Sequence, residues 1–290
     1  MPWLRLSFQV GREEVARWEE ALEAAGACAV SLLAGEPAEE PVLEPGVGEA
    51  PLWRKVTLAA LFPADADRGE LRARLALDER PHRFEWLEDR AWERVWLDRF
   101  GPIRCGRRLW VLPDGREAPE PAAVAMRLDP GLAFGTGDHP TTRLCLEWLD
   151  RHPPEGLQVV DYGCGSGILA IAALLLGARR ALGVDHDPQA LWASRANAAR
   201  NGLGEDRLVL AAPQALPALR AELVLANILA APLIDLAERL TDLLLPEGWL
   251  VLSGFTPAQA DAVARAFPRV AFRRLEVRDG WAMLAGQRCG

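Results

Sequence analysis

The most informative stretch of this sequence is Asp161-Tyr162-Gly163-Cys164-Gly165-Ser166-Gly167. It follows a short apolar run that predicts a strand over Gln158–Asp161, and it precedes an apolar run that predicts a helix over Ile168–Leu176. Glycines let the backbone turn sharply and leave space for a ligand against it. Because ligands of open parallel sheets bind at the carboxyl ends of the strands, this strand–turn–helix unit predicts a ligand-binding α/β fold.

The residues around this stretch continue the alternation of strands and helices. Further strands are predicted at Ala181–Asp185, Arg207–Leu210, Leu223–Ala226, Trp249–Ser253, Val270–Val277 and Trp281–Gln287. Further helices are predicted at Thr141–Asp150, Pro188–Asn201, Pro232–Leu244 and Pro257–Phe267, with a short turn or helix around Gln214–Leu219. Repeated strand–helix units imply a mainly parallel sheet with helices on both faces. The sequence therefore predicts a doubly wound, mainly parallel seven-stranded sheet, in which a final hairpin through Arg278-Asp279-Gly280 adds an antiparallel strand.

The first ninety or so residues have a different pattern. Strands are predicted at Trp3–Val10, Cys28–Leu33, Trp53–Phe62 and Arg83–Leu87, and helices at Glu13–Ala25 and Asp65–Leu77. The order strand, helix, strand, strand, helix, strand is that of the ferredoxin-like α+β domain. An aromatic helix over Asp89–Phe100 and short strands at Leu109–Leu112 and Ala122–Leu128 follow. We therefore predict a small domain over residues 1–88, a linker helix and connector over 89–121, and a larger domain over 122–290.

The composition narrows the possible functions. Half of the 290 residues are hydrophobic and 26% are charged, as in ordinary globular proteins, and the net charge of −8 argues against a protein that binds nucleic acid through bulk electrostatics. The five cysteines form no C-x-x-C pair and there are only four histidines, so we expect no metal site. The only lysine, Lys55, lies in a strand-like run, which makes Schiff-base chemistry a poor candidate. We expect a cytoplasmic monomer without a signal peptide or membrane contact.

The glycine-rich turn does not fit the common phosphate-binding motifs. The strict G-x-G-x-x-G pattern fails because Ile168 or Ala170 occupies the last position, so only the looser G-x-G-x-x-A form from Gly165 to Ala170 remains. No Gly-Lys-Ser/Thr follows, which excludes a P-loop. The next predicted strand ends at Asp185, where a carboxylate can accept both ribose hydroxyls of an adenosine. Asp187 competes for that role, but Pro188 after it is typical of a helix N-cap. The pattern D-x-G-x-G-x-G resembles the first motif of S-adenosylmethionine-dependent methyltransferases.

Two further segments resemble one family. Asp129-Pro130-Gly131-Leu132-Ala133-Phe134-Gly135-Thr136-Gly137-Asp138-His139-Pro140-Thr141-Thr142 lies upstream of the glycines, and Asn227-Ile228-Leu229-Ala230-Ala231-Pro232-Leu233 follows a predicted strand. With Gly163–Leu176 and the Trp92–Trp96 helix, they are similar to the bacterial ribosomal protein L-eleven (L11) methyltransferase, or PrmA, family. The resemblance covers essentially the whole chain. It implies a class I, Rossmann-like methyltransferase domain preceded by a small substrate-recognition domain on a linker helix.

By that resemblance, Thr142, Gly163, Asp185 and Asn227 match the cofactor-binding positions of the family, and the cofactor is S-adenosyl-L-methionine. Gly163 is expected to allow close backbone approach and Asp185 to take the ribose hydroxyls. Asn227 also becomes the catalytic candidate, because related amine methyltransferases begin an Asn/Asp-Pro-Pro-Tyr motif there. Here Ile228-Leu229 replace the prolines, which suits a protein amine better than a flipped base. The implied reaction methylates the α-amine and lysine ε-amines of ribosomal protein L-eleven.

Several alternatives stay open at the level of sequence. His139 is a candidate general base, but a hydrogen bond that fixes its loop is the favoured interpretation. Asp138 is expected to face solvent rather than a sulfonium, and Tyr162 and Cys164 to serve packing. The rival functions are a methyltransferase for a small molecule or an RNA base, and a non-catalytic adenosyl-binding protein. Replacement of Asp185 combined with cofactor titration separates binding from turnover.

Overall fold

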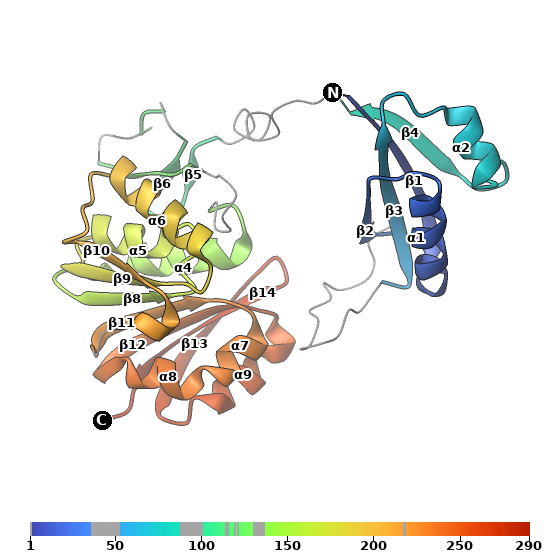
Figure 1. Cartoon of the computed structure of the whole chain (residues 1–290). Coiled ribbons are helices and arrows are strands. Elements are labelled where there is room, and N and C mark those ends of the chain that lie inside the picture. The colour runs from blue at the N-terminus through green and yellow to red at the C-terminus, as the bar shows by residue number, and fades with distance from the viewer. Residues whose placement is uncertain are drawn as a thin grey trace. The chain divides into compact units, whose positions relative to one another are not determined.

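The chain divides into two compact units, which are described separately below. The computed structural model describes residues 2–35, 53–87, 101–113, 116–118, 120, 122–129, 137–216 and 219–290. The N-terminal unit spans Met1–Val95 and the C-terminal unit spans Trp96–Gly290 (Figure 1). The predicted aromatic helix at 89–100 lies outside the described residues, so its role as a linker stays a prediction.

The N-terminal unit is a four-stranded antiparallel sheet with two helices. Its elements in chain order are β1 (Trp3–Gly11), η1 (Arg12–Glu14), α1 (Val15–Ala24), β2 (Ala29–Ala34), β3 (Lys55–Pro63), α2 (Arg68–Arg74) and β4 (His82–Leu87). The strand order is β2-β3-β1-β4. Alternate residues of β1 are buried, and their partners across β3 are buried as well, as at Leu4 opposite Phe62. This period of two gives the sheet one face packed into an apolar core.

The C-terminal unit is built on the predicted seven-stranded sheet. Its strands are β8 (Gln158–Tyr162), β9 (Arg180–Val184), β10 (Leu208–Ala211), β11 (Ala221–Asn227), β12 (Leu244–Phe255), β13 (Val270–Arg278) and β14 (Trp281–Arg288). The order is β10-β9-β8-β11-β12-β14-β13. Neighbouring strands run parallel except for β14, which is antiparallel to both β12 and β13. The doubly wound, mainly parallel sheet is therefore confirmed, including its antiparallel final strand.

Helices cover both faces of this sheet (Figure 1). They are α4 (Pro140–Arg151), α5 (Ile168–Leu175), α6 (Pro188–Arg200), α7 (Ala230–Asp235), α8 (Ala237–Asp242) and α9 (Ala260–Ala266), with 3-10 turns η2 (Pro213–Ala215) and η3 (Pro257–Gln259). Side chains of α4, α5 and α6 share one buried cluster with one face of the sheet, and those of α7, α8 and α9 share a second cluster with the other face. Helix α5 is buried from Ile168 to Leu174, which explains why its sequence is apolar on every side.

The structure corrects two details of the predicted elements. The single helix expected over Pro232–Leu244 is two short helices, α7 and α8, with a break at Leu236. A small three-stranded sheet of β5 (Ile103–Arg104), β6 (Leu109–Leu112) and β7 (Val124–Arg127) precedes α4, and its first strand was not predicted. Buried residues of this small sheet belong to the same cluster as α4 and α5. Among the described residues, no helix is long and apolar enough to cross a membrane.

Candidate functional site

The glycine-rich turn between β8 and α5 depends on three backbone conformations that favour glycine. Gly163, Gly165 and Gly167 have φ angles of +78°, +53° and +79°, where a residue with a Cβ atom is strained. The backbone N–H groups of Gly163 and Cys164 both donate to the Val184 carbonyl at the end of β9. The turn is therefore fastened to the neighbouring strand at the carboxyl edge of the sheet, where a ligand is expected.

Gly163 also makes room for the chain that leaves β11. A Cβ atom at Gly163 would lie 2.3 Å from Ile228 Cγ2, and one at Gly254 would lie 2.3 Å from the Ile228 carbonyl oxygen. Gly254, near the end of β12, has a φ of +99°. Ile228, which follows β11, is thus packed between Gly163 after β8 and Gly254 in β12, the two strands that flank β11, and this packing fixes the position of Asn227 immediately before it. The close contact with Ile228 is therefore enough to require a glycine at position 163, whether or not a ligand is bound.

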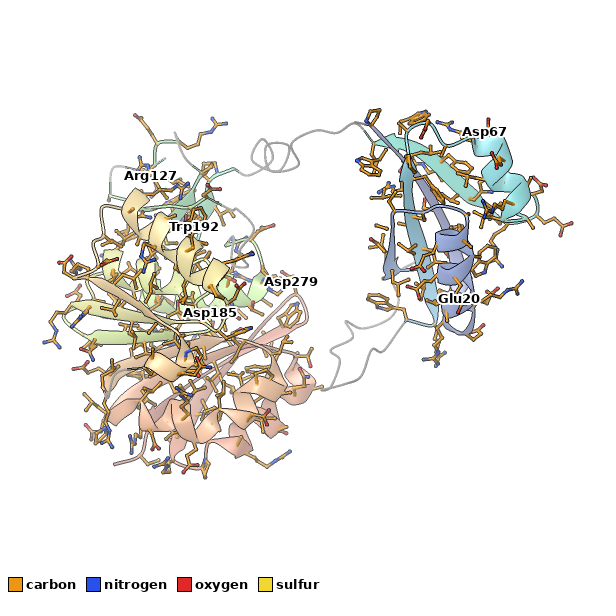
Figure 2. All side chains as sticks on the ribbon, in the orientation of Figure 1. Glu20, Asp67, Arg127, Asp185, Trp192 and Asp279 are labelled. Atoms are coloured by element: carbon orange, nitrogen blue, oxygen red, sulfur yellow. The ribbon has the colours of Figure 1, made fainter. Side chains whose placement is uncertain are left out.

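Asp185 follows β9 directly and lies against the glycine turn (Figure 2). Its Oδ2 accepts a hydrogen bond from the Gly165 backbone N–H at 2.9 Å, and its Oδ1 accepts one from the Asp187 backbone N–H at 3.0 Å. The side chain of Asp185 is only 8% exposed. A carboxylate has about four acceptor positions, so further hydrogen bonds from a ligand can be accommodated. Asp187 instead caps α6, because its Oδ1 accepts from the Gln189 N–H at 2.8 Å.

Asp161 is the most deeply buried acid of the site. Its Oδ2 accepts a hydrogen bond from the Ala170 N–H at 3.0 Å, in the first turn of α5, while its Oδ1 is buried without a hydrogen-bond partner in the described part of the chain. Burial raises the pKa of Asp161 from 3.8 to about 7; the Ala170 hydrogen bond opposes this shift and the charge of Asp185 adds to it. Asp161 therefore holds the start of the helix.

Asn227 and Thr142 are brought together from β11 and α4. Asn227 Nδ2 donates to Thr142 Oγ1 at 3.2 Å, and Thr142 is fully buried. This bond orients the amide of Asn227 so that the other end, Oδ1, is the acceptor. Within the described residues, Oδ1 is buried without a hydrogen-bond partner. Because an unsatisfied buried acceptor costs free energy, Oδ1 is the atom best prepared to receive an N–H from a ligand.

The His139 side chain has a structural role. It caps α4, with Nδ1 at 2.7 Å from Thr141 Oγ1, and its ring packs edge-on against Trp281 at 5.0 Å. Burial lowers the pKa of His139. The capping role agrees with the loop hydrogen bond favoured from the sequence, and Asp138 is exposed as expected. Residues 130–136 of the family-like segment lie outside the described residues.

A set of polar residues on α6 was missed by the sequence analysis. Ser194 and Asn197 of α6 and its C-cap residue Asn201 are spaced by three and four residues, so they lie on one side of the helix. They hydrogen-bond to the glycine turn and to residues 127–129 after β7. The signal was present in the sequence as polar residues at helical spacing among alanines. Their partners could not be inferred, because each lies about 30 or more positions away.

The arrangement presents acceptor groups around a sharp glycine turn. Asp185 and Asn227 Oδ1 lie at the carboxyl ends of β9 and β11, on either side of the strand that carries the turn. Such a set suits a ligand with hydroxyl and N–H donors whose chain passes the turn closely. The structure thus places Asp185 on one side of the glycine turn that includes Gly163, and the Thr142–Asn227 pair on the other side.

Comparisons with known proteins agree over almost the entire chain. A family model described as "Ribosomal protein L11 methyltransferase (PrmA)" matches residues 2–289. A protein of that name from Pseudomonas putida (strain W619) is 50% identical over 293 residues, covering 99% of this chain and 100% of its own. The protein of that name from Pseudomonas paraeruginosa (strain DSM 24068 / PA7) is also 50% identical, covering 99% of each chain. A crystal structure of ribosomal protein L11 methylase from Lactobacillus delbrueckii subsp. bulgaricus has 33% sequence identity and a TM-score of 0.61, covering 66% of this chain and 100% of that one.

Proposed function

The chain belongs to the ribosomal protein L11 methyltransferase (PrmA) family and is a methyltransferase, and from this premise we propose its substrates and its site residues. The methyl donor is S-adenosyl-L-methionine. The acceptors are the α-amine and lysine ε-amines of ribosomal protein L11, modified in the cytoplasm by a monomeric enzyme that makes no direct contact with nucleic acid. The hydrogen bond between Gly165 N–H and Asp185 carries the cofactor part of this proposal, because it joins a carboxylate to a glycine turn at the carboxyl edge of the sheet.

The cofactor is held from both sides of β8, the strand that leads into the glycine turn. Asp185 accepts the two ribose hydroxyls, using acceptor positions that the Gly165 and Asp187 N–H groups leave available. Gly163 lets the turn pass close to the amino-acid part of the cofactor. Thr142 is fully buried, so it contributes by holding Asn227 in place, and Asn227 Oδ1 faces the reacting end.

When bound, the cofactor supplies a methyl group on a positively charged sulfur. Transfer of this methyl group to a neutral amine nitrogen would form an N–C bond as the C–S bond breaks, with S-adenosylhomocysteine as the leaving group and the amine proton released to solvent. The sulfonium is already activated, so the protein mainly positions the partners and excludes water. Asn227 Oδ1 accepts a hydrogen bond from the amine N–H and thereby directs its lone pair, which is why it is the catalytic candidate.

Only a neutral amine can accept the methyl group, so the fraction of the substrate amine that is neutral sets the main energetic requirement. An α-amine with a pKa near 8 is about one-tenth neutral at pH 7, whereas a lysine with a pKa of about 10.4 is only about 0.04% neutral. This difference corresponds to about 3 kcal/mol of extra cost for lysine. Partial desolvation of the lysine beside Asn227 offsets it by favouring the neutral amine, while acceptors such as Asn227 Oδ1 orient the amine N–H groups.

The N-terminal unit is proposed to recognise the substrate. Its chain order and its strand order β2-β3-β1-β4 support a ferredoxin-like fold for residues 1–88. Residues 89–121 then contain the linker helix and the connector, whose strands β5 and β6 pack on the catalytic domain formed by residues 122–290. Movement of the two units across this linker would let one site reach several amines of the same protein.

The decisive experiment follows the methyl group. The purified chain is incubated with methyl-labelled S-adenosylmethionine and purified L11, and mass spectrometry locates the label on L11 peptides. We expect label on the α-amine and on lysines. Absence of label from L11 would contradict the proposal.

Two matched variants separate cofactor binding from structure. Asp185→Ala removes a charged acceptor of hydrogen bonds worth about 1.5–3 kcal/mol each, so binding of S-adenosylhomocysteine should weaken about 100-fold. Asp187→Ser keeps an N-cap residue next to the site and should bind within about threefold of the parent chain.

Asn227→Ala should lower kcat at least about tenfold. If it did not, Asn227 would not be catalytic.

A further inference from the structure

The polar face of α6 contains one residue that joins two separate parts of the C-terminal unit. Asn197 Nδ2 donates to the Ser166 carbonyl in the glycine turn at 3.0 Å, and Asn197 Oδ1 accepts from the Asp129 backbone N–H at 3.1 Å. Its side chain is 2% exposed. Asn201 Nδ2 donates to the Asn197 carbonyl at 2.8 Å, which adds a bond within the helix. Both ends of the Asn197 amide are therefore used by backbone groups far away in the sequence.

The neighbouring residues of the same face contact one part each. Ser194 Oγ donates to the Gly165 carbonyl at 2.8 Å, so it contacts the glycine turn. Asn201 Oδ1 accepts from the Arg127 N–H at 2.8 Å, and Asn201 Nδ2 donates to the Arg127 carbonyl at 2.7 Å, so Asn201 contacts the end of β7. Arg200 adds an ion pair to Asp129 at 2.7 Å. Asn197 lies between these two sets of contacts and connects them.

The glycine turn transmits this connection to the proposed ribose acceptor. Gly165 donates its N–H to Asp185 Oδ2, and its carbonyl accepts from Ser194, while the next carbonyl, that of Ser166, accepts from Asn197. The peptide groups that orient Asp185 are thus held from the side of α6.

We propose that Asn197 is a positioning residue for the methyl donor: it holds the glycine turn in its binding conformation and ties it to residue 129, without touching the donor. This inference rests on the proposed function. An amide is required because it donates and accepts at once, whereas an ionised carboxylate only accepts. Asn197→Asp keeps the acceptor for Asp129 N–H but places an oxygen against the Ser166 carbonyl.

The test measures S-adenosylhomocysteine binding by calorimetry on the full chain from about pH 5.5 to about pH 8.5. For Asn197→Asp we expect the Kd, relative to the parent chain at the same pH, to rise about 10- to 30-fold at the alkaline end, as for the loss of one buried hydrogen bond plus a repulsive contact. Burial raises the pKa of the introduced carboxyl, so acid protonates it and restores the donor. The ratio should then return to within about threefold. At saturating donor, kcat should stay within about threefold, so that the change appears in KM.

Asn201→Asp is the matched control on the same face of the same helix. It makes the same chemical change but has no contact with the glycine turn, so its Kd ratio should stay within about threefold at every pH. Ser194→Ala removes one bond to the turn and should weaken binding about three- to tenfold without pH dependence; it serves as the second variant if Asn197→Asp does not fold. Equal weakening in both aspartate variants, weakening that acid does not reverse, or unchanged binding in Asn197→Asp and Ser194→Ala would each overturn the inference. Failure of the parent chain to bind S-adenosylhomocysteine would instead overturn the proposed function and, with it, the inference.

Discussion

The two units of the chain bury different kinds of side chain. In the N-terminal unit, the described core consists of apolar residues such as Leu4, Phe8 and Phe62. Every polar or charged side chain that is buried among the described residues lies in the C-terminal unit; they are Thr141, Thr142, Asp150, Asp161, Ser166, Asp185, Ser194, Asn197, Thr241 and Ser253. Burying such groups costs free energy unless each finds a partner. The apolar core of the N-terminal unit therefore stabilises that unit, whereas in the C-terminal unit part of the stabilisation from the core is offset by the cost of burying polar groups.

Most of these buried polar groups gather around the glycine turn and the carboxyl edge of the sheet. Asp185, Ser194 and Asn197 all hydrogen-bond to backbone groups of the turn. Asp150 is the clearest exception: it lies at the end of α4 and accepts N–H bonds from Arg107, Arg108 and Leu109, which fastens the small sheet to that helix. The difference between the units indicates that the buried polar groups of the C-terminal unit mainly hold the proposed site in place, whereas the buried residues of the N-terminal unit only fill its core.

The largest expected effect tests whether the two cores are independent. Phe62→Ala removes a side chain that is 1% exposed from the core of the N-terminal unit, and such truncations cost about 3–5 kcal/mol. We expect the N-terminal unit to unfold at lower denaturant concentration, measured by fluorescence of the full chain in urea. Binding of S-adenosylhomocysteine should stay within about threefold of the parent value.

Val263→Ala in the C-terminal unit is the counterpart of that variant. Val263 is fully buried in the cluster that includes α9. Its truncation should lower the stability of the C-terminal unit and leave the transition of the N-terminal unit unchanged. If Phe62→Ala abolished cofactor binding, the folding of the C-terminal unit would depend on the core of the N-terminal unit.

The second-largest expected effect concerns Asp161, the buried carboxyl whose pKa is raised. The pKa of Asp161 is raised by burial to about 7, against 3.8 in the unfolded chain. Well below about pH 4 the carboxyl is protonated in both states and makes no pH-dependent contribution to stability. As the pH rises from about 4 to about 7, the unfolded chain ionises first, so the folded state loses relative stability, by about 4 kcal/mol at most. Above about pH 7 both states are ionised and the cost is constant.

Asp161→Asn removes this cost while keeping an acceptor for the Ala170 N–H. We therefore expect the variant to gain stability relative to the parent chain as the pH rises from about 4 to about 8, measured by urea unfolding at each pH. Asp67→Asn, at an exposed helix cap in the N-terminal unit, is the comparison and should show no such gain. A stability difference that did not change with pH would show that Asp161 is not held in an unfavourable charged form.

The contrast between the units also explains how far the sequence could predict the structure. Alternating Leu4 and Phe8 in β1, and the glycines between β8 and α5, are local patterns, so both sheets and the position of the site were predictable. Asp185 could be chosen because it ends the strand beside the glycine turn, at the carboxyl edge of a parallel sheet, whereas Asn227 was chosen only from the resemblance to the family. What these residues do in the site is still a proposal.

The missed features all depend on contacts between distant segments. Asn197 and Asp150 look like ordinary polar residues of helices until their backbone partners are known. The break at Leu236 and the strand Ile103–Arg104 are likewise decided by packing rather than by local propensity. Gly254 gave no signal, because a single glycine near the end of a strand has no distinctive pattern.

The smallest expected effect separates backbone strain from contact by using one glycine from each unit. Gly254 and Gly26 have similar φ angles, +99° and +95°, so alanine is strained by about the same amount at both. They differ in surroundings: a Cβ at Gly254 would meet the Ile228 backbone at 2.3 Å, whereas nothing lies within 4 Å of a Cβ at Gly26. Gly26→Ala should therefore cost only about 1 kcal/mol of stability in the N-terminal unit. Gly254→Ala should cost more than that, because the clash with the Ile228 backbone adds to the strain, and, because relief of the clash displaces Ile228 and with it Asn227, it should lower kcat/KM for the methyl donor about tenfold. Steady-state kinetics and urea unfolding on both variants measure the two parts. Equal kinetic losses would mean that strain alone matters, and that Ile228 does not fix Asn227.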